Sequence, residues 1–289
     1  MFISDEYGPY VREFNAHTGK LVETFTLPAN LDVSKLSPQG AAEISGNTSG
    51  RTANKGMEGL AITPDGKTLV GFMQAALIQD AAVKASKKML RIVTIDIATG
   101  VTHEYGYMLT TGSGVSEVIA INDHQFLVDE RDGEGLGVGD AAVVKQLFKI
   151  DLTGATDITN LSGAAAAAAT MVQKSATPFL DIVSALGAAG IPATQVPSKI
   201  EGLAFGADVT LNGQQVHTLY VANDNDFVAG AAGPNKFFVF GFTDSDLPGY
   251  AAQQLSSSVP EPGTWGVMIL GLAAIGAAAR RRRVLEVCK

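Results

Sequence analysis

Three glutamates hold the same place in three similar segments of the chain, and carboxylates gathered in this way can bind a cation or exchange protons. Each segment opens with a glutamate and apolar residues, passes through a tight turn, and ends in a strand with acidic or polar groups. The glutamates are Glu58, Glu117 and Glu201. Further acids lie at the ends of the strands predicted to pair with these segments: Asp5, Glu6, Glu130, Asp224 and Asp226. Because carboxylates a few ångströms apart repel one another, such a cluster needs protons or a cation.

A hard cation is the simplest remedy, and Ca²⁺ accepts about six to eight oxygen ligands without strict geometry. The eight acids above are therefore predicted to form a Ca²⁺ site. Bound Ca²⁺ would attract phosphate, polarise a phosphoester and acidify a water molecule. In this interpretation Glu58 or Glu201 serves as a ligand or base, while Lys199 and Arg131 supply positive charge for an anionic group.

A purely structural interpretation of the same acids stays open. Acids at strand ends also cap turns, accept hydrogen bonds from backbone amides, or pair with lysine and arginine. Other catalytic motifs are missing from the sequence: there is no G-x-S-x-G nucleophile elbow, no P-loop at Gly66-Lys67-Thr68, and no EF-hand starting at Asp224. The four histidines (His17, His103, His124 and His217) do not have zinc spacing.

The elements that position these acids are predicted to be strands, which makes the fold all-β. Tight turns are expected at 64–66, 122–124 and 211–213, and another hairpin is expected around 17–19. The repeated glutamates lie 59 and 84 residues apart. Strand pairs at such irregular spacing favour a β-propeller with long insertions, which would bring the glutamates to one mouth. A β-sandwich is the alternative. A short inserted helix is predicted within 179–190, after an alanine run at 162–170.

The C-terminal 31 residues contain three elements that follow one another without a gap. A Pro260-Glu261-Pro262 triplet precedes an uncharged stretch, 263–279, and four arginines at 280–283. Seventeen residues rise roughly 25 Å as a helix, the short end of the range for a membrane span. This order resembles the PEP-CTERM tail of exported Gram-negative proteins. The resemblance implies processing by an exosortase-type protease, an inner-membrane helix before processing, and a final location in the periplasm or at the cell surface. A buried Gly/Ala-rich helix is the alternative.

These features predict three parts: a folded domain at 1–250, a linker at 251–258 and the tail at 259–289. The chain has a net charge of −8, and without the five basic and two acidic residues of 259–289 it would be −11. Such a surface excludes nucleic acid as a partner. The lone cysteine, Cys288, lies in the tail, so no disulfide forms within the chain. Met1 leads directly into FISDEYGP without an export leader, so the natural protein is expected to extend further upstream.

Five strings spread over the body resemble the phytase-like family, whose members are associated with esterase-like activity. They are SDEYGPYVREFN (4–15), NKGMEGLAITPDGKTL (54–69), SEVIAINDHQFLVDERDGEG (116–135), KIEGLAFG (199–206) and VANDNDF (221–227). The resemblance implies a propeller, and in such proteins an earlier strand pair precedes the DEYGP string, which again predicts a missing upstream part. With the acidic cluster, it predicts a Ca²⁺-dependent hydrolase of phosphoesters or related esters. The alternative is a non-catalytic propeller that binds a ligand at the cell surface or in the matrix.

Overall fold

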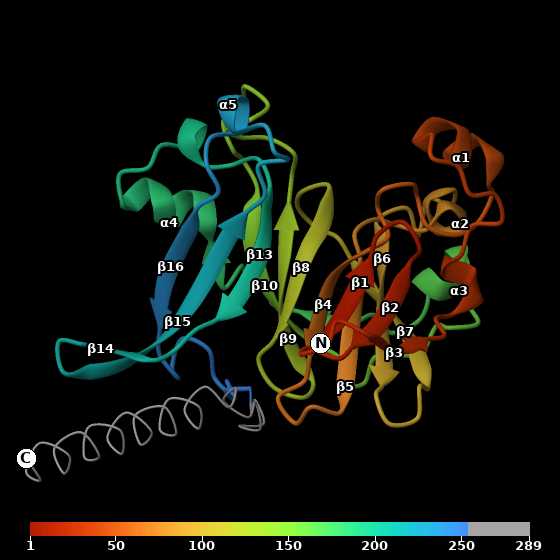
Figure 1. The fold of residues 1–289 in the computed structure, drawn as a ribbon, viewed down its shortest axis with the longest axis horizontal. Coiled ribbons are helices and arrows are strands. Elements are labelled where there is room, and N and C mark those ends of the chain that lie inside the picture. The colour runs from red at the N-terminus through yellow and green to blue at the C-terminus, as the bar shows by residue number, and fades with distance from the viewer. Residues whose placement is uncertain (254–289) are drawn as a thin grey trace, which may run out of the picture. The chain divides into compact units, whose positions relative to one another are not determined.

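A computed structural model describes residues 1–253, which form one compact unit. Its strands make four antiparallel sheets that follow one another along the chain (Figure 1). The first sheet contains β1 (Phe2–Asp5), β2 (Tyr10–Phe14) and β3 (Leu21–Phe25), and the second contains β4 (Met57–Ile62), β5 (Thr68–Met73), β6 (Met89–Asp96) and β7 (Thr102–Met108). The expected turns at 17–19 and 64–66 join β2 to β3 and β4 to β5.

The third and fourth sheets repeat this plan. The third contains β8 (Gly114–Ala120), β9 (Gln125–Arg131), β10 (Lys145–Asp151), β11 (Gln173–Lys174) and β12 (Leu180–Asp181), with both short strands pairing with β10. The fourth contains β13 (Ile200–Phe205), β14 (Val209–Leu211), β15 (Gln214–Asn223) and β16 (Phe237–Phe242), with β15 between β13 and β16. The turn at 122–124 joins β8 to β9. The turn at 211–213 joins β14 to β15, so β14 is an extra strand inserted into the predicted hairpin.

Short helices lie in the connections between strands. They are η1 (Ala29–Leu31), α1 (Gly40–Gly46), α2 (Ile78–Ala81), α3 (Gly163–Ala167), α4 (Ile182–Ala188), η2 (Ala193–Gln195) and α5 (Ala229–Ala232). Helix α4 is the predicted inserted helix: Asp181 caps its N-terminus by accepting a hydrogen bond from the Ser184 amide, and Gly190 just beyond it has a φ of 86°. Its buried residues, Ile182 and Leu186, pack into the core between the third and fourth sheets.

The sheets pack face to face, and three apolar clusters lie at their contacts. Val11 and Phe25 of the first sheet meet Leu69 and Val93 of the second. The largest clusters lie on either side of the third sheet, one against the second sheet and one against the fourth. Strands β4, β8 and β13 are neighbours, and β1 lies beside β4. Strands predominate in the described residues and the helices between them are short, so the predicted all-β class is confirmed. The four sheets of residues 1–253 do not close into a ring.

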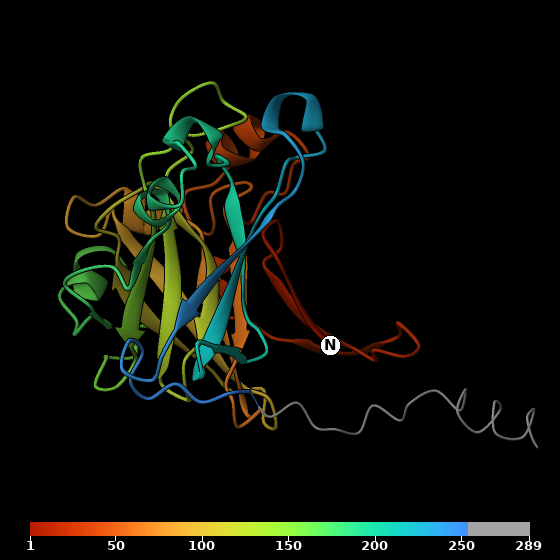
Figure 2. The ribbon, with the colours of Figure 1, turned by 90° about the vertical axis from the view of Figure 1, so that its left-hand side faces the viewer.

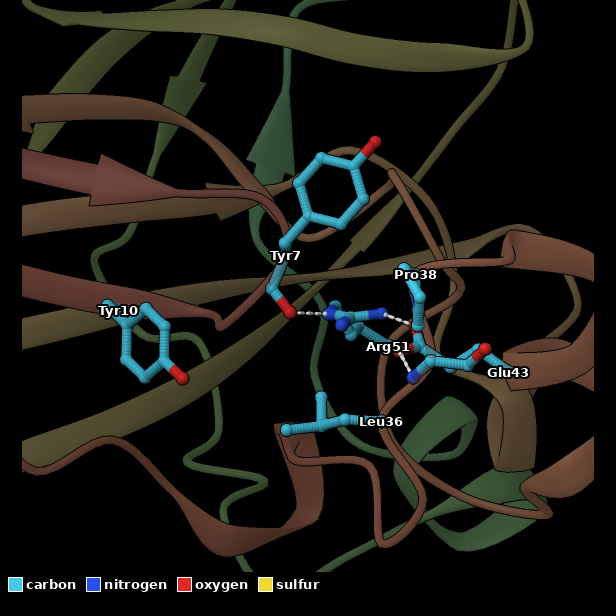
Figure 3. A pocket seen from close by; sticks show the side chains of 7 residues that line it. Tyr7, Tyr10, Leu36, Pro38, Glu43 and Arg51 are labelled. Atoms are coloured by element: carbon cyan, nitrogen blue, oxygen red, sulfur yellow. Dashed lines mark hydrogen bonds and ion pairs between the residues drawn. The ribbon is translucent and has the colours of Figure 1, made fainter.

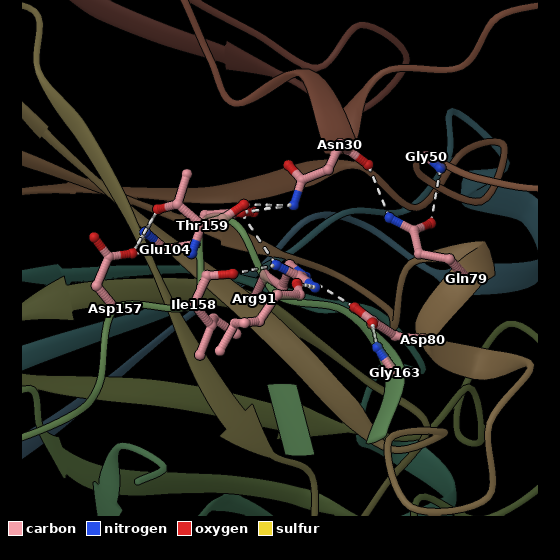
Figure 4. Close-up of polar contacts among 11 residues, drawn as sticks. Asn30, Gly50, Gln79, Asp80, Arg91, Glu104, Asp157, Ile158, Thr159 and Gly163 are labelled. Atoms are coloured by element: carbon pink, nitrogen blue, oxygen red, sulfur yellow. Dashed lines mark hydrogen bonds and ion pairs between the residues drawn. The ribbon is translucent and has the colours of Figure 1, made fainter. Parts of the chain in front are cut away.

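A buried polar cluster ties the second sheet to its connecting segments (Figure 4). The Arg91 guanidinium on β6 donates to Asp80 (2.8 Å), to Glu104 (3.1 Å) and to the Leu161 carbonyl (2.8 Å). Asp80 also accepts a hydrogen bond from the Gly163 amide at 2.7 Å. All three charged side chains are fully buried. Because a buried charge without partners is costly, these bonds hold α2 and α3 against the sheet.

One end of the unit gathers the parts that carry the predicted site. Strands β1, β5, β9 and β15 end there, and β4, β8 and β13 begin there, as the antiparallel registers require. Figure 1 shows this end at the top, where α5 follows β15. Figure 2 shows the same end from the side, with the strands running down from it.

Candidate functional site

Irregularities in strand pairing place the three repeated glutamates. In each of the second, third and fourth sheets, the first strand shifts its register against its paired neighbour (β5, β9 and β15) near its start, and the glutamate lies within the shift. The shifts fall between Met57 and Gly59, between Val115 and Val118, and between Ile200 and Gly202. A bulge of this kind leaves a residue without a cross-strand partner and re-aims its side chain. The same distortion therefore turns Glu58, Glu117 and Glu201 in three successive sheets.

The strands that carry two of these glutamates approach each other closely. A Cβ atom on Gly59 would lie 3.0 Å from the Val118 amide nitrogen and 3.1 Å from the Glu117 main chain. That spacing is tighter than ordinary van der Waals contact, so β4 and β8 can pack this closely because glycine follows Glu58.

Arg131, at the end of β9, links two of the glutamates. Its Nη2 donates to Glu201 Oε1 and lies 3.7 Å from Glu58 Oε1. Its Nε donates to the Ser116 hydroxyl. We call Glu58, Glu201, Arg131 and Ser116 the acid–arginine site. The guanidinium thus supplies, from within the chain, positive charge that the sequence had assigned mainly to a bound cation.

Burial changes the acidity of the carboxyls at this site. It raises the pKa of Glu58 to about 8, and the nearby Arg131 charge only partly opposes this. It also raises the pKa of Glu201 and of Glu6, the latter helped by repulsion from Glu201. Glu58 Oε2 is buried without a hydrogen-bond partner, which leaves a charge on this carboxyl poorly stabilised. Glu58 therefore retains its proton at neutral pH.

A second pair of carboxyls lies deeper. Asp129 on β9 is fully buried, neither of its oxygens has a hydrogen-bond partner, and burial raises its pKa to about 7. Glu117 accepts a hydrogen bond from the Val118 amide at 2.9 Å, and burial raises its pKa to about 8, with repulsion from Asp129 adding to the effect. At neutral pH Glu117 is therefore mostly a neutral acid, whereas Asp129 is close to half-protonated.

Glu130 was predicted to belong to the acidic cluster with Glu58, Glu117 and Glu201. In the structure it lies on the other face of β9. Alternation along β9 puts Glu130 on the opposite face from Asp129 and Arg131. There its carboxylate accepts hydrogen bonds from the Thr111 amide (2.8 Å), the Tyr107 hydroxyl and Lys174. Burial alone would raise the pKa of Glu130, but these hydrogen bonds outweigh it and lower that pKa. Asp129, at the adjacent position, is the residue of this strand that lies with the other acids.

The predicted site acids outside the acid–arginine site mainly accept hydrogen bonds within turns or form ion pairs at the surface. Asp5 accepts hydrogen bonds from the Tyr7 and Gly8 amides at 2.9 and 2.6 Å. Asp224 accepts one from the Asp226 amide at 2.9 Å. Lys199 pairs with Asp226 at 2.6 Å and is partly exposed at the rim. These residues match the turn-capping alternative, although the charges of Asp224 and Asp226 add to the burial that raises the pKa of Glu201.

A small polar cavity of about 120 Å³ opens beside the acid–arginine site. Its lining consists of Lys55, Gln74, Ser113, Gly114, Ser116 and Arg131. Two cations and two hydroxyl groups make it suited to an anionic group, and its volume is several times the roughly 30 Å³ that one water takes up in the liquid. Lys55 and Ser116 were not among the predicted site residues, although both lie in the family-like strings 54–69 and 116–135, because neither is acidic.

The described residues do not present a ready-made metal site. In residues 1–253, no group of three or more histidine, cysteine, aspartate or glutamate side chains is arranged to hold an ion. Arg131 stands between Glu58 and Glu201, where a shared Ca²⁺ was expected. Binding of Ca²⁺ at this end of the molecule stays a prediction.

The predicted processing motif (Pro260, Glu261 and Pro262) and the predicted membrane helix at 263–279 lie outside the described residues. Within 1–253, no helix combines the length and apolar character needed to cross a membrane.

Comparisons with known proteins agree with the predicted family and with the predicted sorting tail. The family model described as "Esterase-like activity of phytase" matches residues 1–227, and the model described as "PEP-CTERM protein-sorting motif" matches residues 258–283. A protein from Arthroderma benhamiae named "Uncharacterized secreted protein" is 33% identical over 127 residues. That match covers 38% of this chain and 25% of the relative, so the chain corresponds to only part of the longer protein.

Proposed function

Because this chain belongs to the phytase-like family, we propose that it hydrolyses a phosphoester or a related ester at the acid–arginine site. The observation that supports this most strongly is a protonated acid beside a cationic cavity. Glu58, with a pKa of about 8, lies 3.7 Å from the Arg131 guanidinium, and Arg131 lines the polar cavity with Lys55. A proton donor next to a cationic pocket can assist ester hydrolysis by protonating the leaving group and balancing the developing negative charge.

In the proposed reaction, the anionic group enters the cavity and its charge is balanced by Arg131 and Lys55. A water molecule attacks the phosphorus, and the bond between phosphorus and the leaving oxygen breaks. Glu58 donates its proton to that leaving oxygen, and Glu201 accepts a proton from the attacking water. Exchange with solvent returns both carboxyls to their starting states. For a carboxylic ester, the same transfers accompany attack at the acyl carbon.

Lys199 has a supporting role in this proposal. It is paired with Asp226 and partly exposed, so it lies at the rim and can attract an anionic substrate without contacting the reacting atoms. Ca²⁺ is the remaining cofactor hypothesis. Asp129 is the acid whose buried oxygens lack partners, and Ca²⁺ there would require further acids to move toward it, since no three acids in residues 1–253 are already arranged to hold an ion.

A non-catalytic binding module is the alternative, and one observation favours it. The Arg131 guanidinium already donates to Glu201, Ser116 and the Asp132 carbonyl and lies near Glu58, so it can act as a fixed structural link. In that case a ligand would bind at the cavity without being turned over.

We further propose a propeller arrangement for the sheets and an extracytoplasmic location for the protein. Four sheets packed face to face, with β4, β8 and β13 as neighbours, support a propeller arrangement. The PEP-CTERM motif marks the chain for an exosortase-type sorting system. Together with the secreted relative, it supports export to the periplasm or cell surface, with the C-terminal helix in the inner membrane before processing.

The experiment is a substrate panel applied to the full-length chain and two matched variants. 4-Nitrophenyl phosphate, phytate and 4-nitrophenyl acetate are incubated with the wild type, with Glu58→Gln and with Lys67→Gln, which changes an exposed surface lysine. We expect turnover of at least one substrate, a loss of about 100-fold or more in Glu58→Gln, and no loss in Lys67→Gln. Equal turnover in all three proteins would refute the role of Glu58. No turnover together with phosphate binding that Arg131→Gln abolishes would establish the binding module instead.

A further inference from the structure

A second cavity lies between the first hairpin and the segment around α1, and we propose that it binds a small organic anion with a flat apolar body. Its volume is about 270 Å³, and its lining consists of Tyr7, Tyr10, Leu36, Ser37, Pro38, Glu43 and Arg51. Figure 3 shows the two tyrosine rings and Leu36 around an open space with Arg51 at its floor. This site shares no lining residue with the cavity at the acid–arginine site.

The floor of the cavity is a buried ion pair that still has donor capacity. Arg51 is 1% exposed and Glu43 is 3% exposed. Arg51 donates Nε to the Tyr7 carbonyl and Nη1 to one oxygen of Glu43. The other Glu43 oxygen accepts the Ser37 amide at 3.0 Å. Within residues 1–253, Arg51 Nη2 makes no hydrogen bond to a protein group, so the guanidinium can donate to a ligand that enters the cavity.

The walls are apolar and, unusually for such side chains, exposed. Tyr7 is 54% exposed, Tyr10 40% and Leu36 68%. The Arg12 guanidinium lies 4.4 Å from the centre of the Tyr10 ring, which fixes that ring in place. Large apolar side chains gathered around a concave floor with few polar groups are typical of a small-molecule site. Two aromatic rings and a leucine favour a flat apolar body over a polar chain.

The charge of the ligand follows from the hydrogen-bonding groups of the cavity lining that have no partner within the protein. Aromatic side chains also form cages for cations, but here a guanidinium forms the floor and a second one covers a face of Tyr10. Each Glu43 oxygen already accepts a hydrogen bond and the carboxylate charge is paired with Arg51, which disfavours a cation at the floor. A carboxylate would instead accept a charge-assisted hydrogen bond from Arg51.

The test uses 2-naphthoate as the probe and 2-naphthamide as its uncharged counterpart, measured by calorimetry on the full-length chain. Naphthoate is expected to bind at least ten-fold more tightly than the amide, because a hydrogen bond to a charged group is the stronger interaction. Equal affinities for the two compounds, or no saturable binding of naphthoate at millimolar concentration, would overturn the proposal.

Two variants locate the binding without disturbing the buried ion pair. Leu36→Glu adds a negative charge at the exposed rim, and Tyr7→Ala removes a ring while keeping the main-chain carbonyl that Arg51 uses. Each should weaken naphthoate binding about ten-fold or more. Leu211→Glu is the matched control, since Leu211 is 55% exposed on β14 and lines neither described cavity. If Leu36→Glu and Leu211→Glu bind naphthoate equally well, the probe does not occupy this cavity.

Discussion

Replacing Glu58 with glutamine should remove part of the pH dependence of this protein's free energy of unfolding. Burial raises the pKa of Glu58 from 4.5 to about 8. Between these two values the folded state binds more protons at this position than the unfolded state does. The free energy of unfolding therefore falls as pH rises through that window. Glutamine keeps the shape of the protonated acid and cannot ionise, so Glu58→Gln should not share this loss.

The size of the effect follows from the pKa. Each pH unit within the window is worth ~1.4 kcal/mol, so ~3 kcal/mol should accumulate between pH 5 and pH 8 for a pKa of about 8. Relative to the wild type, Glu58→Gln should therefore gain about 3 kcal/mol of stability over that range. Urea unfolding of both proteins at pH 5, 6, 7 and 8 measures this difference directly.

Glu130→Gln is the control for this measurement. Hydrogen bonds from Lys174, Thr111 and Tyr107 outweigh burial and lower the pKa of Glu130, so this carboxyl is ionised in the folded state throughout pH 5 to 8. Its replacement should cost a nearly constant amount of stability across that range. If the stability difference between Glu58→Gln and the wild type is also constant from pH 5 to 8, Glu58 is not a protonated acid at neutral pH. The proposed proton donor would then be lost.

Three further outcomes are expected. Asp80→Asn should lower the free energy of unfolding by about 3 kcal/mol because it weakens the buried partner of Arg91, whereas Lys67→Gln at an exposed pair should cost less than about 1 kcal/mol in the same urea titration. If Ca²⁺ binds the acidic end, a hundredfold excess over its Kd adds about 2.7 kcal/mol, and a melting temperature that neither Ca²⁺ nor chelator changes would exclude it. Mass spectrometry of the protein from its native host should find a C-terminus near Val259, and arginines 280–283 retained in the surface fraction would argue against processing.

The sequence determined the local features of this protein. Turn residues such as Pro64-Asp65-Gly66 and the apolar segments beside them identified the hairpins, because turn chemistry and strand patterning are local properties. The helical spacing of apolar residues within 179–190 likewise located α4. The tail motif and the family strings were also readable directly, since each depends on residue order alone, and the family and sorting-motif matches confirm them.

Which residues come together at the acid–arginine site depends on contacts between distant parts of the chain, and these contacts cannot be read from the order of residues. Sequence reasoning found that Glu58 and Glu201 belong together. It could not show that bulges turn them toward one another or that Arg131, from a different sheet, would lie between them. Strand alternation placed Asp129 with the acids and Glu130 with Lys174, although the two residues are adjacent in sequence. The cavity around Arg51 joins the turn after β1 to residues about 30 to 45 positions later. Burial and charge neutralisation act through space, so the tertiary structure alone decides which acids keep their protons and which form ion pairs.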